Sequence, residues 1–457
     1  MPHVVVRADA DASLGAGHVV RCLSIAAELL GRGVAVTFVT RAPDGLADRI
    51  AATGARIARL PGGSGTSGDA RRPWPAERQQ ADLEHTRSLL DGPADLTIVD
   101  HYGLDHRWEH GINGPVLVID DLADRRHVCA ALVDQNWYGP DSGHRYDGLA
   151  DGAILLLGPR YALLQPEYRE RRRSLVHNWP PRRVLVSFGG TDASAQTTKA
   201  VRALVRDGLA GVEVDVVVGS PDRVTDELAQ LARRHPSVDL HVAVPSLAPL
   251  LAHADLAIGA AGSGTWERLC MNVPAIVVTT SMHQSGVTAA LHAHQQTVWL
   301  GVAADTTEQD YRRAFLALQR APRPAVAPLV DGWGARRVAN WIAARVGGAP
   351  AALRLRASGR DDAASILGVR AEAAGTPTTG WAGGVFATPE EWAREVALPV
   401  AADDPATSEP WVVEAAGCPV GIATQRNGRL EVVLDRSTAA VAPTGDLEGL
   451  APSDDTS

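Results

Sequence analysis

The sequence predicts an α/β protein with two Rossmann-like domains, followed by a smaller α+β segment. Short apolar runs alternate with helical stretches from Val4 to about Gly158, and the alternation starts again at Arg183. Strands that alternate with helices are typical of parallel, doubly wound sheets.

A connector separates the two series of strands. The arginine-rich stretch 169–173 precedes Trp179-Pro180-Pro181, and the prolines stop any helix there. The expected units are an N-terminal domain at 1–178, a second domain at 179–348, a partial α+β segment at 349–440 and a disordered tail, rich in acidic and small residues, at 441–457.

The first domain combines apolar strands with one long amphipathic helix. We expect a helix over Val19–Leu30, where Ala and Leu recur at helical spacing, and a flexible glycine-rich loop over 61–75. The expected strands are Val4–Val6, Val34–Val39, Leu96–Val99, Val116–Ile119 and Ile154–Leu157.

The second domain repeats this plan. Helices are expected near Ala195, after Ser263 and over Ala335–Val346. The expected strands are Arg183–Phe188, Val212–Val218, Val238–Val244, Leu256–Ala260 and Ala275–Val278.

Composition excludes several classes of function. The net charge of the 457 residues is -9, so no basic surface for nucleic acid is expected. Lys199 is the only lysine, which excludes a P-loop and disfavours a lysine Schiff base. The 4 cysteines are far apart and predict buried thiols in a reducing, cytoplasmic compartment. We expect a monomer without membrane insertion, metal or cofactor.

The segment Gly15-Ala16-Gly17-His18 places a histidine between the end of a strand and the start of a helix. Ligands of α/β sheets bind at the carboxyl ends of the strands, where such glycine turns lie. Histidine is mostly neutral near pH 7, so His18 is a candidate general base. The alternative is a histidine that merely caps the helix or bonds a carbonyl.

Two glycine turns in the second domain are candidate phosphate sites. Residues 189–191 and 262–264 each follow a strand and precede a helix, which exposes backbone N–H groups to an anion. Glu267 follows the second turn, where a carboxylate can accept two hydrogen bonds from a ribose diol. Alternatively, it only complements the positive end of the helix.

Further polar side chains follow strands of the first domain. Asp100 could orient a histidine or bind a sugar hydroxyl, and Tyr102 could cover a sugar face, whereas His101 is more typical of a structural histidine. We expect residues 120–121 to cap a loop rather than bind magnesium. Asp9 lies in an Asp-x-Asp pattern, which we assign to the sugar site rather than to a metal.

These segments together resemble the UDP-sugar hydrolases of the pseudaminic acid pathway, relatives of the GT-B glycosyltransferases. The resemblance covers about residues 3 to 345 and rests on 7–9, 15–23, 98–102 and 187–192. It implies two domains that face a central cleft and hydrolysis of a UDP-linked diacetamido-trideoxyhexose. The implied site consists of His18 and Asp9 as catalytic residues, Arg7, Gly17, Asp100, Tyr102, His283 and Gln284 at the sugar, and Gly189, Gly190, Thr191, Gly262, Ser263, Gly264 and Glu267 at the nucleotide.

The chain departs from the family pattern at two positions. His283 stands where the family has asparagine, and Gln165 where it has arginine. Either change could alter the choice of sugar. Two alternatives therefore stay open: a UDP-sugar-dependent glycosyltransferase, and a catalytically silent protein that binds sugar nucleotides.

The third part resembles the first half of a GNAT acetyltransferase over about residues 353 to 437. The glycine- and arginine-rich turn that binds the pyrophosphate of acetyl-CoA in that family is missing here. We therefore expect a truncated module without acetyltransferase activity.

Overall fold

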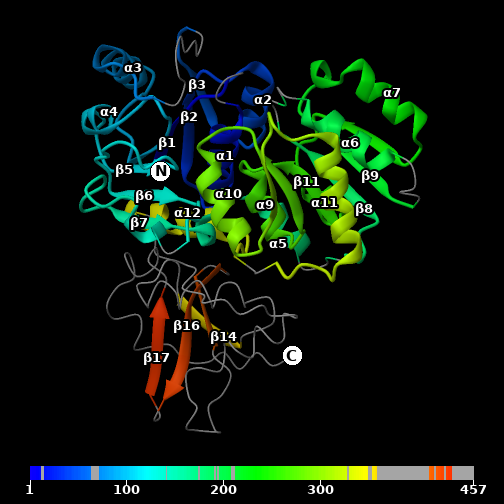
Figure 1. Cartoon of the computed structure of the whole chain (residues 1–457). Helices are drawn as coiled ribbons and strands as arrows, with labels where there is room; N and C mark the ends of the chain where they lie inside the picture. Colours follow the sequence, from blue (N-terminus) through cyan, green and yellow to red (C-terminus); the bar gives the residue numbers. More distant parts are fainter. Residues whose placement is uncertain are drawn as a thin grey trace.

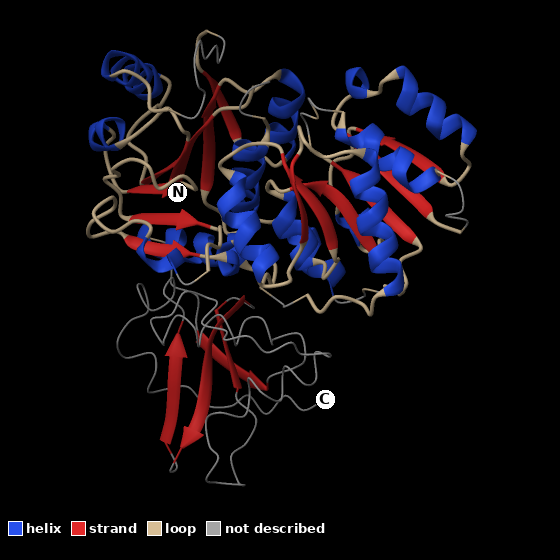
Figure 2. Cartoon of the chain, viewed as in Figure 1, coloured by secondary structure: helices blue, strands red, loops and turns tan. Residues whose placement is uncertain are grey.

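A computed structural model describes most of the chain. The described residues are 1–11, 15–62, 72–139, 141–172, 175, 177–189, 192, 195–206, 211–326, 329–347, 353–357, 411–415, 418–426 and 429–434. Within these ranges the strands form three sheets: two parallel sheets side by side and a small antiparallel sheet below them (Figures 1 and 2). The expected α/β fold with two Rossmann-like units is confirmed.

The first unit holds a seven-stranded parallel sheet in the order β3-β2-β1-β4-β5-β6-β7. Its strands are β1 (His3–Ala8), β2 (Ala35–Thr40), β3 (Arg56–Arg59), β4 (Leu96–Asp100), β5 (Val116–Ile119), β6 (Ala131–Asp134) and β7 (Ile154–Leu157). All five expected strands are present. The short edge strand β3 and the four-residue β6 were not predicted, and β3 begins and ends on exposed arginines.

Helices cover both faces of this sheet, which is what continuous apolar strands require. Val4 and Val6 join a core cluster with one layer of helices, whereas Val5 faces the other side. The helices are α1 (Gly17–Leu30), α2 (Asp44–Ala52), α3 (Ala76–Ser88) and α4 (His106–Gly111), with 3-10 turns at Asp141–His144 and Pro159–Tyr161. The next helix, α5 (Pro166–Arg171), already packs on the second unit.

The second unit holds a six-stranded parallel sheet in the order β10-β9-β8-β11-β12-β13. Its strands are β8 (Arg183–Ser187), β9 (Glu213–Val218), β10 (Val238–Val242), β11 (Leu256–Ala260), β12 (Ala275–Thr279) and β13 (Val298–Val302). Its helices are α6 (Gln196–Val205), α7 (Asp226–Arg234), α8 (Ala248–Leu251), α9 (Gly264–Cys270), α10 (Gln284–Ala293) and α11 (Glu308–Arg320), with a 3-10 turn at Pro221–Arg223. Only β13 was not predicted; it is half-buried, and Gly301 interrupts it with a φ of 101°.

Helix α12 (Gly334–Arg345) returns from the second unit to the first. It lies within the range expected for the second domain, but its apolar face packs against α1, and Val338, Trp341 and Ile342 belong to the core of the first unit. Its Arg337 is fully buried and forms an ion pair of 2.6 Å with Asp331.

The third sheet is antiparallel, in the order β14-β15-β16-β17. Its strands are β14 (Leu353–Ala357), β15 (Trp411–Ala415), β16 (Cys418–Arg426) and β17 (Arg429–Leu434). Arg337 Nη2 in α12 donates to the carbonyl oxygen of Pro419 in β16 at 2.9 Å, which links this sheet to the first unit. The expected tail 441–457 lies outside the described residues, and the resemblance to acetyltransferases stays a prediction.

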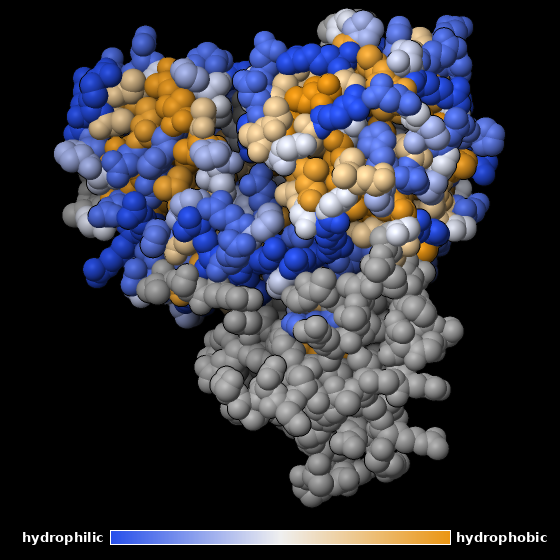
Figure 3. All heavy atoms as spheres, turned by 180° about the vertical axis from the view of Figure 1, so that it is seen from behind, coloured by the Kyte–Doolittle hydropathy of each residue, from blue (hydrophilic) through white to orange (hydrophobic). Residues whose placement is uncertain are grey.

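Among the described helices, none has the length together with the apolar character that a membrane span needs. On the face seen in Figure 3, apolar residues form separate patches among polar ones on both units.

The start of α12 predicts a strict requirement for glycine. A Cβ atom at Gly334 would lie 2.3 Å from the carbonyl oxygen of Ala162, so backbone would have to move. We expect Gly334→Ala to lower the free energy of unfolding by about 1–3 kcal/mol, as other overpacked sites do. Gly45→Ala in α2 is the control, because nothing lies within 4 Å of its Cβ position and alanine favours a helix. Chemical denaturation measures both, and equal stability of the two variants would contradict the close approach.

Candidate functional site

His18 is the second residue of α1, at the carboxyl edge of the first sheet. Gly15 (φ 75°) turns the chain after β1, and its N–H donates to the carbonyl of Asp11 at 2.8 Å. The imidazole does not cap the helix: its Nδ1 lies 2.5 Å from Oδ1 of Asp100, the last residue of β4. The side chain of His18 is 7% exposed and that of Asp100 is 0% exposed, so the pair is almost fully enclosed.

Arg21 holds the other side of the same carboxylate. Its Nε donates to Asp100 Oδ2 at 2.6 Å and its Nη2 to Oδ1 at 2.7 Å. Burial alone would raise the pKa of Asp100, but the charges and hydrogen bonds of Arg21 and His18 lower it well below its usual value. An ionised Asp100 accepts the Nδ1 proton of His18, which leaves Nε2 as the nitrogen that can accept a proton.

Tyr102 packs edge-on against the imidazole. The two ring centroids are 4.5 Å apart at an interplanar angle of 87°. Burial and the hydrogen bond to Asp121 raise the pKa of the Tyr102 hydroxyl, so it stays protonated. Tyr102 therefore orients His18, and it is buried rather than spread over the crevice.

Arg7 and Asp9 form a separate, closed cluster at the end of β1. Arg7 is fully buried and donates twice to Asp9, at 2.6 and 2.9 Å, and twice to Asp82, at 3.0 and 2.8 Å. Arg41 donates to the same two carboxylates at 3.0 and 2.8 Å. Burial opposes ionisation of Asp9, yet Arg7 and His101 keep its pKa well below the usual value. The direct sugar contact and the catalytic role expected of Arg7 and Asp9 do not fit this enclosed arrangement, since these cations and His101 surround the carboxylate.

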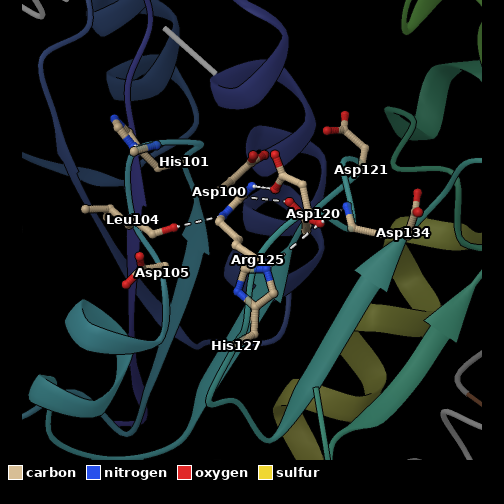
Figure 4. A network of polar contacts seen from close by, with 12 residues as sticks. Asp100, His101, Leu104, Asp105, Asp120, Asp121, Arg125, His127 and Asp134 are labelled. Carbon is tan, nitrogen blue, oxygen red and sulfur yellow. Dashed lines mark hydrogen bonds and ion pairs between the residues drawn. The ribbon is translucent and has the colours of Figure 1, made fainter. Parts of the chain in front are cut away.

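His101 is a satisfied structural residue, as its position at a strand end suggested. Its Nε2 lies 3.2 Å from Asp9 Oδ2, and its Nδ1 accepts the N–H of Gly103 at 2.9 Å. In Figure 4 it points away from Asp100.

Three further carboxylates follow strands β5 and β6, close to Asp100 (Figure 4). Asp120 accepts from Arg125 at 2.7 Å and from the N–H of Ala123 at 2.8 Å, which is the loop-capping role expected of it. Asp121 forms an ion pair of 3.0 Å with Arg21. Burial and the charge of Asp121 raise the pKa of Asp134 to about 7. Among the described residues, no group of three or more His, Cys, Asp or Glu side chains is arranged to hold a metal ion.

Sequence reasoning overlooked Arg21 and Asp134 and expected Asp121 only to cap a loop. Arg21 carried a usable signal, because residues i and i+3 lie on one helix face and Arg21 is three residues after His18. Asp121 and Asp134 stand at strand ends, but only the order of the strands places β5 beside β4 and β6 beside β5.

The glycine turn at 262–264 forms a rim of the second unit with the start of α10. Gln284 Nε2 lies 3.6 Å from the position of a Cβ on Gly262, so the turn 262–264 and the α10 turn are neighbours. His283 is exposed, and its Nδ1 contacts Ser281 Oγ at 2.8 Å. Gly189 follows β8 with a φ of 80°. Gly190 and Thr191 lie outside the described residues.

Glu267 in α9 contacts Tyr168 in α5, the helix that leads into the second unit. Burial raises the pKa of Glu267, while the hydrogen bond from Tyr168 and the charge of Arg268 act in the opposite direction. Burial likewise lowers the pKa of Arg268 to about 10, against the charge of Glu267. Glu267 is half-buried as a residue, and its Oε2 lies 3.8 Å from a Cβ position on Gly264 of the glycine turn.

Tyr138 connects the rim of the second unit with the carboxylates near His18. A Cβ on Gly286 in α10 would lie 3.2 Å from Tyr138 Cε1, and the Tyr138 hydroxyl donates to the carbonyl of Asp121 at 3.2 Å. Asp121 in turn holds Arg21, so a short chain of contacts joins α10 to the carboxylate that His18 uses. A furrow between the two units is visible from behind in Figure 3.

The raised pKa of Asp134 predicts a pH-dependent stability. A carboxyl group whose pKa is higher in the folded than in the unfolded protein stabilises the folded state as long as it is protonated. This contribution is complete below the unfolded pKa of about 3.9 and is lost as the pH rises to the folded pKa of about 7. We therefore expect Asp134→Asn to gain thermal stability over the unmodified protein as the pH rises from 4 to 7. Asp82→Asn is the control, because Arg7 overcomes burial and lowers the pKa of Asp82 to about 2, so its contribution to stability changes only below about pH 4. Melting temperatures at pH 5 and pH 8 should therefore show a constant difference for Asp82→Asn and a growing gain for Asp134→Asn; a pH-independent difference for Asp134→Asn would contradict the assignment.

Comparisons with known proteins agree with the fold. No protein-family model matches the chain. It is 22% identical over 289 residues to an uncharacterised protein of Methanocaldococcus jannaschii (60% of this chain, 55% of the relative) and 26% identical over 192 residues to the spore coat polysaccharide biosynthesis protein SpsG of Bacillus subtilis (40% and 56%). The chain thus spans about half the length of these relatives.

Two solved structures share its architecture. The calicheamicin glycosyltransferase CalG4 is 17% identical and superposes with a TM-score of 0.52 over 76% of this chain and 98% of its own. The glycotransferase of kitacinnamycin is 18% identical, with a TM-score of 0.50 over 76% and 100%. The two parallel-sheet units therefore have the fold of GT-B glycosyltransferases.

Proposed function

We propose that this protein is an enzyme that acts on a nucleotide sugar, with His18 as its general base. The observation that carries the proposal is the hydrogen bond between His18 Nδ1 and the ionised, buried Asp100 at the carboxyl edge of a parallel sheet. An anionic partner on Nδ1 directs the basic lone pair to Nε2 and stabilises the imidazolium that forms when Nε2 takes a proton.

The reaction we infer is hydrolysis at the anomeric carbon. Nε2 of His18 takes a proton from water, and the oxygen of that water bonds to C1 while the bond from C1 to the diphosphate oxygen breaks. The bonding electrons leave with UDP, whose charge the N–H groups of the turns at 189–191 and 262–264 would bind. Because a diphosphate is a good leaving group, no general acid is required.

The sugar we propose is a diacetamido-trideoxyhexose, which supplies nonulosonic acid biosynthesis. This rests on the resemblance of segments 7–9, 15–23, 98–102 and 187–192 to the pseudaminic acid pathway hydrolases. The likeness to a spore coat polysaccharide biosynthesis protein supports a role in making surface sugars. In this assignment His283, Gln284 and Gly17 contact the sugar, Tyr102 orients His18 from behind, and Arg7 and Asp9 support the sheet edge beside it.

A glycosyltransferase is the second candidate, favoured by the fold shared with the calicheamicin glycosyltransferase and the glycotransferase of kitacinnamycin. An acceptor hydroxyl would then take the place of water. The deciding experiment incubates the purified protein with a panel of UDP-diacetamido-trideoxyhexoses and follows phosphorus NMR. A hydrolase releases UDP and free sugar, a transferase without acceptor leaves the substrate nearly intact, and tight binding without turnover under any condition indicates a silent binding protein.

The first prediction of this proposal concerns the base. His18→Asn and His18→Ala should lower kcat by ~10²–10⁴, because neither side chain can take the proton that Nε2 of His18 accepts, while UDP binding stays within a few fold. His110→Asn, on the exposed side of α4, is the matched control and should keep normal turnover. Near-normal kcat in the His18 variants would refute the assignment.

A second prediction concerns the nucleotide. Glu267→Ala should weaken UDP binding by about 10–100-fold, equivalent to the roughly 1.5–3 kcal/mol of a charged hydrogen bond. The loss should be smaller for 2′-deoxy-UDP, because the hydroxyl that the carboxylate would contact is already absent. Calorimetric titration measures both. Equal losses for the two nucleotides would show that Glu267 does not bind the ribose 2′-hydroxyl. Tyr168→Phe separates this effect from loss of the hydrogen bond between Tyr168 and Glu267.

A further inference from the structure

One buried cation of the His18 site has no role in the reaction described above. Arg21 lies one turn after His18 on α1 with its side chain 9% exposed. Its Nε and Nη2 reach both oxygens of Asp100, and Nη1 reaches Asp121 Oδ2 at 3.0 Å. All three guanidinium nitrogens are therefore engaged, and the fork fixes the plane of the Asp100 carboxylate.

Without these hydrogen bonds from Arg21, Asp100 would support His18 less well as a base for two reasons. The carboxylate could rotate away from Nδ1, because the remaining donors are His18 itself and the weak Sγ donor of Cys22, 3.6 Å from Oδ2. Its uncompensated negative charge would also favour a proton on His18, and a protonated imidazole cannot act as a base. The cation of Arg21 opposes both, since Nη2 lies 3.4 Å from His18 Nδ1.

The other charged and titratable groups around the imidazole do not replace this effect. Tyr102 packs on the ring as a neutral phenol. Asp121 adds a negative charge that would favour the protonated imidazole, and Arg21 neutralises that charge too.

We propose that Arg21 is a positioning residue for the base: it fixes Asp100 against His18 Nδ1 and, through its own charge, keeps the imidazole unprotonated. This inference rests on the proposed role of His18 as the base. It adds that Arg21 contributes to kcat in two separable ways, through the hydrogen bonds that hold Asp100 and through its positive charge.

Two substitutions in the full chain separate the contributions. Arg21→Lys keeps the charge but, as a single ammonium, loses the fork. We expect kcat to fall about 5–50-fold, KM to stay within a few fold, and the acidic limb of the pH profile of kcat to stay in place. Arg21→Gln removes the charge as well, so kcat should fall at least as far and the acidic limb should move to higher pH by about one unit.

Imidazole ¹⁵N NMR of the protein without substrate gives a second readout. In Arg21→Gln the protonation midpoint of the His18 ring should rise by about one pH unit, whereas in Arg21→Lys it should stay within a few tenths. Arg169→Gln is the matched control, because it removes an arginine from a carboxylate of the same helix, Glu28, at 2.7 Å. It should affect unfolding without moving either readout.

The outcomes distinguish this inference from the proposed function. If His18→Asn loses turnover while Arg21→Gln moves neither the pH profile nor the NMR midpoint, Arg21 is only structural and the inference fails alone. If His18→Asn keeps turnover, the proposed base is wrong whatever Arg21 does. Should Arg21→Gln not fold, Arg21→Lys still decides, because unchanged kcat in that variant overturns the positioning role.

Discussion

The carboxylate of Asp100 is the constraint on which the first unit's site depends. It lies fully buried at the end of the central strand β4, where an isolated charge would be very costly. Arg21 and His18 supply its partners, and both come from the first turns of α1. The turn at Gly15 must therefore start α1 where His18 and Arg21 can reach the carboxylate at the end of β4. The positions of the glycine turn, the helix and the strand end depend on one another.

A second buried charge cluster stands next to the first and contrasts with it. At the end of β1, the guanidinium groups of Arg7 and Arg41 donate to the carboxylates of Asp9 and Asp82, so two cations neutralise two anions within the cluster. At the end of β4, in contrast, His18 leaves one ring nitrogen outside its bond with Asp100. Neighbouring strands of one sheet thus carry a closed cluster that supports the edge and an open one suited to chemistry.

Much of the fold could be predicted from the sequence, because buried parallel strands are continuous apolar runs. The strands β3 and β13 escaped for local reasons, the arginines at both ends of β3 and Gly301 in β13. β6 is as long as the predicted β5 and β7, so its length does not explain why it was missed. The helix α12 was expected, but its partner α1 lies more than 300 residues earlier, and no local pattern encodes such a contact. The same limit applies to the site. His18 was found from its glycine turn. Asp9 looked like a sugar ligand because Arg41, Asp82 and His101, which close its cluster around the nearby Arg7, come from distant segments.

The return of the chain through α12 gives both connections between the units one common anchor. One connection carries α5 and the other leads into α12, and a single carboxylate, Glu28 on α1, binds an arginine from each: Arg169 at 2.7 Å and Arg336 at 3.1 Å. Both connecting helices are thus fastened to the first unit through the same acidic side chain. The third sheet shares this attachment, since Arg337 ties it to α12, which packs on α1.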